Sequence, residues 1–135
     1  MELSDEQLDR LLSCMGYRLE VVRRPVVPEL TRSERRSWML HRQLSIHLTR
    51  TTFDMWRPTL ERNLERLTDG VTGQPHTRNL ELWRSLVEEG DMLGLQRVLT
   101  GLDRQSIEMR EVSPMGGLLS EGERLEVLDE LAMVG

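Results

Sequence analysis

The sequence predicts an all-α fold, a compact multi-helix domain with one short β-strand near its N-terminus. Apolar residues recur at helical spacing along most of the chain, and glycine or proline ends most of these runs. Pairs of the capping-box type, in which a serine or threonine precedes a glutamate or glutamine by three residues, mark several helix starts. These pairs are Ser4/Gln7, Thr31/Glu34 and Ser120/Glu123. A chain of 135 residues is long enough for one domain with a small appendage.

Residues 1–27 form the predicted appendage, a helix followed by a strand. Leu8, Leu11, Leu12 and Met15 recur at helical spacing after Ser4, and Gly16 follows them as a left-handed cap. Residues 17–23 then alternate between apolar and polar side chains, which is typical of a strand. A single strand is not stable alone, so we expect Tyr17 to Arg23 to pair with a second copy or another chain. This segment is a candidate dimerisation or docking arm.

Residues 28–135 are predicted to form an α-helical domain, which begins after a linker bounded by Pro25 and Pro28. The clearest apolar stripe consists of Phe53, Trp56, Leu60, Leu64 and Leu67. Pro58 falls within this stripe, so we expect the helix either to kink at Pro58 or to begin just before it. The first two expected helices cover about 32–50 and a segment capped by Thr51 or Thr52. The next three run from Thr77 or Asn79 to Glu89, over 91–100 and over 103–111. A last helix starts at Ser120 and carries Leu125, Leu128 and Leu131. A loop over 68–78 and a turn over 113–117 interrupt them.

Composition restricts the classes of function and the compartment. The net charge is −5, so the molecule as a whole repels nucleic acid unless its 18 arginines cluster on one face. The single cysteine, Cys14, lies in an apolar pattern and is expected to be a buried thiol, because no disulfide framework is available. No apolar run is long enough to span a bilayer, and the acidic N-terminus lacks a signal-like apolar region. We therefore expect a cytoplasmic protein.

The sequence shows no arrangement that favours catalysis, a cofactor or a metal ion. His41 and His47 lack the four-residue spacing of a helical metal pair, so structural roles are expected for both. Ser37 and His41 are four residues apart and could touch, but no oxyanion loop or orienting carboxylate accompanies them. We therefore predict a protein that is not an enzyme.

The densest basic cluster lies in the first turns of the helix that starts near Thr31, where the helix dipole disfavours positive charge. It consists of Arg32, Arg35, Arg36 and Arg42, with Trp38 among them. One interpretation is a surface neutralised by Glu29 and Glu34. The others are a site for an acidic protein partner or for nucleic acid. Trp38 is either a core residue or part of a binding hot spot.

The chain resembles a known family at several of these signals. Residues 11–22 (LLSCMGYRLEVV) are similar to the end of a Cro/C1-type helix-turn-helix domain. The rest of the chain resembles the C-terminal domain of actinobacterial helix-turn-helix antitoxin-like regulators. The resemblance lies, in chain order, in residues 28–37 (PELTRSERRS), Asn63 to Arg66, the Trp83 helix and residues 113–120 (SPMGGLLS). The helix-turn-helix itself is largely missing, because the upstream helices, including the recognition helix, have no counterpart here.

The resemblance implies an antitoxin or immunity protein, which neutralises a partner protein by occlusion. The implied partner is a nucleotidyltransferase-type toxin of a toxin–antitoxin or phage-defence system. An alternative is a DNA-associated transcriptional regulator or a phage-encoded host-interaction protein, and nucleic acid is the less favoured partner. The residues predicted to bind a partner are Arg32, Arg35, Arg36, Trp38, Arg42 and Met115, the last within the turn over 113–117.

Overall fold

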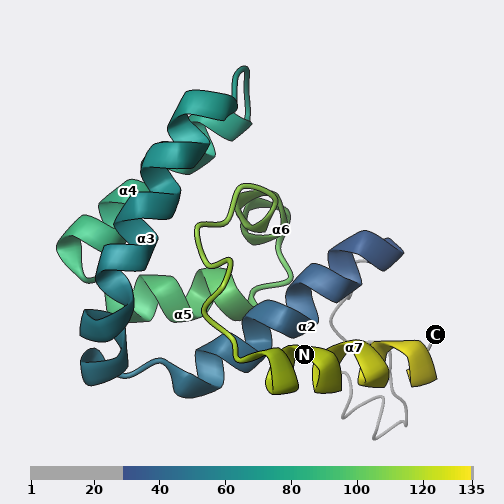
Figure 1. The fold of residues 1–135 in the computed structure, drawn as a ribbon. Helices are drawn as coiled ribbons and strands as arrows, with labels where there is room; N and C mark the ends of the chain where they lie inside the picture. Colours follow the sequence, from purple (N-terminus) through teal and green to yellow (C-terminus); the bar gives the residue numbers. More distant parts are fainter. Residues whose placement is uncertain (1–28, 135) are drawn as a thin grey trace, which may run out of the picture.

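The computed structural model describes residues 29–134, which form six α-helices (Figure 1). They are α2 (Arg32–His47), α3 (Arg50–Gly70), α4 (His76–Glu89), α5 (Met92–Thr100), α6 (Arg104–Arg110) and α7 (Glu121–Val134). The described residues contain no strand, which confirms the all-α class. The predicted helix over residues 4–16 and the predicted strand from Tyr17 to Arg23 lie outside the described residues. Within residues 29–134, no helix is long and apolar enough to cross a membrane.

The predicted capping pairs begin two of the described helices. At α2 the capping box is complete, because Glu34 N–H donates to Thr31 Oγ1 and Thr31 N–H donates to Glu34 Oε1, both at 3.0 Å. At α7 only half of it forms. Glu123 N–H donates to Ser120 Oγ at 3.2 Å, but the Glu123 carboxylate contacts Gln43 and His47 of α2 instead of the backbone of Ser120.

The helix predicted over about 32–50 corresponds to α2, which is a few residues shorter than expected. α2 ends at His47, because Leu48 leaves helical geometry at φ −75° and ψ 107° to bury its side chain. Thr49, and not Thr51 or Thr52, caps α3: its Oγ1 accepts a hydrogen bond from Thr52 N–H at 3.1 Å. This break lets α3 leave α2 at a corner, so that both helices contribute to one core (Figure 1).

Pro58 neither starts nor ends α3, which begins at Arg50 and continues to Gly70. Proline cannot donate a hydrogen bond to the carbonyl four residues earlier, which belongs to Asp54. Both Pro58 and Asp54 are exposed, so water can reach that carbonyl. Phe53, Leu60 and Leu64 on the opposite side of α3 are buried, as the apolar stripe predicts.

The described residues bury two apolar clusters of unequal size. The main core lies between α3, α4, α5 and α6, with the end of α2 and the turn over 113–117 closing it. Its members are Leu44, Leu48, Phe53, Leu60, Leu64, Leu80, Trp83, Val87, Leu95, Val98, Leu99, Met109, Val112 and Met115. The small core contains Met39 of α2 and Val127 and Leu131 of α7, with Trp38 and Leu40 packed against it.

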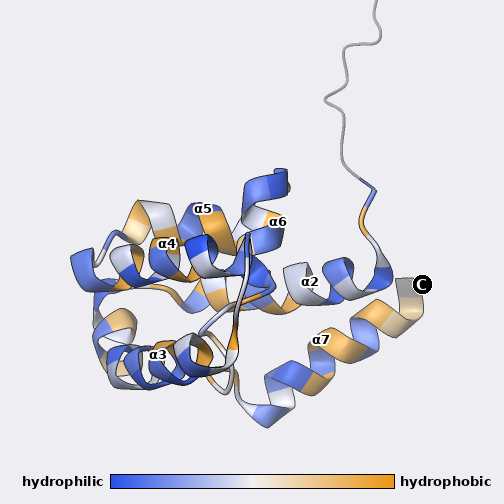
Figure 2. Cartoon of the chain, turned by 90° about the horizontal axis from the view of Figure 1, so that it is seen from above, coloured by the Kyte–Doolittle hydropathy of each residue, from blue (hydrophilic) through white to orange (hydrophobic). Residues whose placement is uncertain are grey.

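α7 runs antiparallel to α2 and contacts the rest of the domain mainly through it. Glu123 at the start of α7 pairs with His47 at the end of α2, and Leu131 near the end of α7 packs against Met39. Figures 1 and 2 both show the first turns of α2 beside the C-terminal end of α7. The main core and the α2–α7 pair are therefore two separately packed regions that share α2.

Candidate functional site

One row of α2, with two exposed and two half-buried side chains, contains half of the residues predicted to bind a partner. Arg35, Trp38, Arg42 and Ile46, which we call the α2 ridge, fall on one side of the helix by their spacing. Arg42 lies over the Trp38 ring, with its guanidinium carbon 4.9 Å from the ring centroid. Trp38 is half-buried, and its Nε1–H donates to the Thr100 carbonyl at 2.9 Å. The indole is thus held by α5 while one part of it remains available to a partner.

Two exposed aliphatic side chains extend this surface. Ile46 of the α2 ridge is 68% exposed, and Leu93 of α5 is 74% exposed. Gln96, one turn after Leu93, donates to the Ser45 carbonyl at 3.1 Å, which joins α5 to α2 at this point. Ile46 and Leu93 therefore flank the same interhelical hydrogen bond.

The remaining two arginines of the predicted cluster do not belong to the α2 ridge. Arg32 and Arg36 are exposed, and they continue the row of Met39 and Gln43 that faces α7. Arg36 also lines a pocket between α2 and α6. The predicted cluster is therefore divided between two sides of one helix.

In the part of the chain that the structure describes, Glu29 and Glu34 do not neutralise the arginines of α2 as the first interpretation of the cluster expected. Glu34 caps Thr31 and forms an ion pair with Arg104 of α6 at 3.2 Å. Within residues 29–134, no ion pair joins Arg32, Arg35, Arg36 or Arg42 to a carboxylate. These four arginines therefore keep their positive charge unpaired with respect to the described carboxylates.

Met115 does not lie on the surface. It is only 4% exposed and belongs to the main core, so it cannot contact a partner unless the turn rearranges. Two side chains hold the turn in place. Asn63 Nδ2 donates to the Pro114 and Gly116 carbonyls, at 2.8 and 3.1 Å, and His41 of α2 contacts Ser113.

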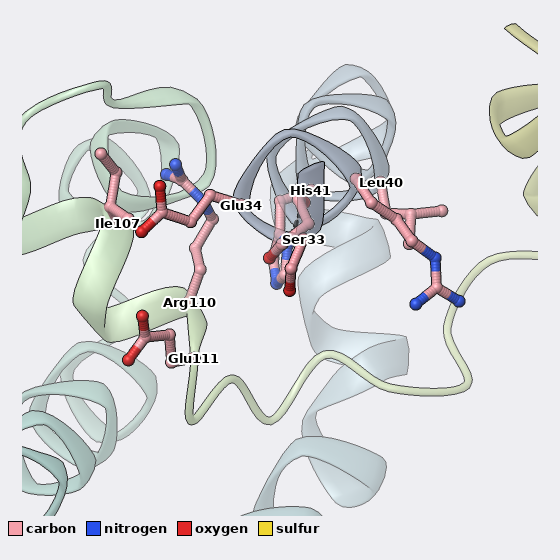
Figure 3. Close-up of a pocket in the computed structure, with 9 residues that line it drawn as sticks. Ser33, Glu34, Leu40, His41, Ile107, Arg110 and Glu111 are labelled. Carbon is pink, nitrogen blue, oxygen red and sulfur yellow. Dashed lines mark hydrogen bonds between the residues drawn. The ribbon is translucent and has the colours of Figure 1, made fainter. Parts of the chain in front are cut away.

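The pocket between α2 and α6 brings ionisable groups together and has a volume of about 370 Å³. Figure 3 shows Ser33, Glu34 and His41 from α2 near Arg110 and Glu111 at the end of α6. Sequence reasoning placed no functional residue on α6. No local pattern distinguishes Arg110 from the exposed arginines, because its burial depends on how α6 packs.

Arg110 is buried, with 4% of its surface exposed, and only one of its nitrogens is paired. Nη1 donates to the carbonyls of Val98 and Gly101, both at 2.8 Å, and so ties α6 to the end of α5. Gly101 suits this junction because a Cβ there would lie 2.7 Å from the Arg97 carbonyl. Nε and Nη2 of Arg110 have no hydrogen-bond partner, and burial lowers the pKa of its guanidinium while Asp103 and Glu34 raise it.

His41 is a buried, neutral structural histidine, in agreement with the role expected for it. Nδ1–H donates to the Ser37 carbonyl at 2.7 Å, so Nε2 accepts the hydroxyl proton of Ser113, also at 2.7 Å. The predicted contact with the Ser37 hydroxyl is present but longer, at 3.3 Å. The pKa of His41 is lowered to about 4, mainly by burial and also by the nearby charge of Arg110, while the hydrogen bond to the Ser37 carbonyl opposes the shift.

This arrangement favours a structural link over catalysis. The Ser113 hydroxyl donates to a histidine, as a nucleophile would, and both residues also line a second cavity of about 450 Å³. However, an imidazole with a pKa of about 4 is a weak base at neutral pH. Ser113 Oγ also accepts the Met115 N–H at 3.1 Å, so it acts within the turn. The pair connects α2 to that turn.

The other predicted histidine, His47, is exposed and pairs with Glu123 at 2.6 Å, which lowers the pKa of that carboxyl group. Within residues 29–134, no group of three or more histidine, cysteine, aspartate or glutamate side chains is placed to hold a metal ion.

Comparisons with known proteins give no family assignment. No family model matches the chain, and neither curated proteins nor solved structures show a significant match to it. The function must therefore be argued from the surface and the pockets of this molecule.

Proposed function

We propose that this protein is a non-catalytic binding protein of the antitoxin or immunity type, which neutralises a partner protein by covering it. The α2 ridge is the proposed contact surface. The observation that carries the proposal is the Arg42–Trp38 stack on α2, next to exposed Ile46 and without an ion pair to any described carboxylate.

The chemical character of the ridge supports a protein partner. Tryptophan and arginine are the residues most enriched at the energetic centres of protein interfaces, and exposed aliphatic side chains add area that burial stabilises. A stacked arginine also loses less conformational freedom on binding, because its side chain already rests on the indole ring. The ridge is therefore partly ordered before a partner arrives.

Charge suggests that the partner surface is acidic. Arg35 and Arg42 offer two guanidinium groups that can pair with carboxylates in bidentate fashion. The net charge of −5 disfavours a polyanion as large as duplex DNA, whereas a local acidic patch needs only the ridge. The resemblance to antitoxin-like regulators names the class of partner to test first, a nucleotidyltransferase-type toxin.

The test is co-expression with the product of the neighbouring gene, followed by co-purification and a growth assay. We expect the wild-type protein to co-purify with that product and to relieve its toxicity. Replacing Arg42 with alanine should weaken the complex by about tenfold or more, since hot-spot residues contribute about 2 kcal/mol. Arg78→Ala, on the exposed side of α4, is the matched control and should bind normally.

Three outcomes contradict the proposal. The first is that the chain fails to co-purify with the product of the neighbouring gene. The second is that Arg42→Ala and Arg78→Ala weaken the complex equally. The third is duplex DNA binding that falls steeply with salt and is lost in Arg42→Ala, which would favour the DNA-associated regulator instead.

A further inference from the structure

The last helix carries an apolar row that no described element covers. Val127 and Leu131 of α7 are buried against α2. Leu125, Leu128 and Ala132 form a second row at the spacing of adjacent helical turns. Leu125 is 48% exposed and Ala132 is exposed, whereas Leu128 is half-buried. Of the leucines that the sequence places on this helix, only Leu131 is buried, because α7 turns Val127 and Leu131 towards α2.

A helix with apolar residues on two sides normally packs on two sides. Figure 2 shows apolar segments along α7 up to its C-terminal end, although only α2 lies against it. The outer row therefore lacks a packing partner within residues 29–134.

The place where residues 1–28 join the described part indicates what covers this row. Glu29 directly precedes α2, whose first turns lie beside the C-terminal end of α7 (Figures 1 and 2). The linker of residues 17–28 can span at most about 40 Å when fully extended, whereas α7, with 14 residues, is only about 21 Å long. A segment before this linker can thus reach any position along α7.

The sequence predicts a segment of suitable chemistry before that linker. Residues 4–16 carry Leu8, Leu11, Leu12 and Met15 on one side of the predicted helix. This row spans eight residues, as the outer row of α7 does from Leu125 to Ala132. We propose that residues 4–16 pack in cis on Leu125, Leu128 and Ala132 of α7 and complete the small core.

Charge in the linker agrees with this path. Arg23 and Arg24 precede Glu29 by five or six residues, so they stay within about 20 Å of Glu29, which lies at the start of α2 near the C-terminal end of α7. That end carries the exposed carboxylates of Asp129 and Glu130 together with the negative end of the helix dipole. Attraction between these groups would direct the linker along α7.

Cys14 makes the proposal testable with one substitution, because it is the only cysteine in the chain. It lies one turn after Leu11, at the edge of the predicted apolar row. In the full-length chain, Ala132→Cys places a second thiol in the outer row of α7, and Met55→Cys places one at an exposed site on α3 as the control. A short bis-maleimide is added to dilute protein, and crosslinks are identified by mass spectrometry.

Docking in cis predicts that A132C forms an intramolecular crosslink to Cys14 about tenfold or more faster than M55C, because docked thiols have a high effective concentration. Leu12→Asp in the A132C chain should reduce that rate to the M55C level. Equal rates in A132C and M55C would overturn the proposal. Crosslinks that join two chains would show that the segment packs on a second copy, which also contradicts docking in cis.

Discussion

The main core and the α2–α7 pair are held together in different ways. The main core buries fourteen apolar side chains from five helices and the turn, and its largest member, Trp83, also donates to the Met109 carbonyl at 2.6 Å. The small core buries Met39, Val127 and Leu131, and polar contacts of Glu123 supplement it. Stability is therefore concentrated in the first region. The surface proposed for binding lies on α2, the helix that both regions share.

Because the two regions are packed separately, the stability that a substitution removes can be distinguished from its effect on partner binding. A change in the main core should unfold the whole domain, because each buried side chain there contacts several helices. A change in the small core should release α7 first, and a change at an exposed ridge residue such as Arg42 should alter neither region strongly.

Trp83→Ala should give the largest loss of stability. Trp83 is fully buried at the centre of the main core, and its removal leaves both a large cavity and an unpaired Met109 carbonyl. We expect the free energy of unfolding to fall by about 3–5 kcal/mol, measured by urea titration with circular dichroism. A loss below about 1 kcal/mol would contradict the assignment of the main core.

Acid should weaken the link between the two regions through His41. Its pKa is about 4 in the folded state and near 6.5 when exposed, so the unfolded chain binds more protons between these values. Stability should therefore be complete above pH 6.5 and fall by about 3 kcal/mol as the pH drops to 4. The measurement is urea titration across this range on the wild type and His41→Asn.

The difference between the two pH curves isolates His41. Hydrogen bonds and ion pairs also lower the pKa values of Glu34, Asp103 and Glu123, and these carboxylates lose their contribution as they are protonated at lower pH. These three carboxylates are also present in His41→Asn, so their contribution to the pH dependence of stability cancels when the two proteins are compared. Parallel curves for the two proteins would contradict the buried, neutral state of His41.

The sequence predicted the local features of both regions. Capping at Thr31, the apolar stripe of α3 and the helix end at Gly90 depend on residues a few positions apart, and all three are present. Gly90 adopts the left-handed conformation expected of a glycine cap, with φ 62°. The break between α2 and α3 was predicted but placed a few residues late, because Thr49 and not Thr51 or Thr52 accepts the capping hydrogen bond.

The features that determine the candidate site depend on tertiary packing. His41 and Ser113 are far apart in the sequence, and nothing local predicts that they meet. Arg110 is buried and Met115 lies in the core because α6 and the turn close over α3 and α4. The division of the arginine cluster likewise depends on which sides of α2 meet α5 and α7, and spacing alone does not specify this.

Leu131→Ala should have a smaller and more local effect than Trp83→Ala. Leu131 is one of three buried residues in the small core, and α7 depends on α2 for its packing. We expect a loss of about 2–3 kcal/mol and faster amide hydrogen exchange in α7, with unchanged protection in α3 and α4. Met55→Ala, on the exposed side of α3, should change stability by less than about 0.5 kcal/mol. Equal loss of protection in all helices would show that the two regions unfold as one.

Thr31→Ala should have the smallest effect of the four predicted changes and should act mainly on the start of α2, the helix that both regions share. The substitution removes the Oγ1 acceptor of Glu34 N–H, and the partner hydrogen bond to the Glu34 carboxylate weakens with it. We expect a loss of about 1 kcal/mol and faster exchange in the first turn of α2 and at the adjacent end of α7. Thr51→Ala, an exposed threonine that does not cap α3, is the matched control. If both variants lost the same stability, the capping box would not be what orders the start of α2, and the position of Arg35 and Arg42 would need another explanation.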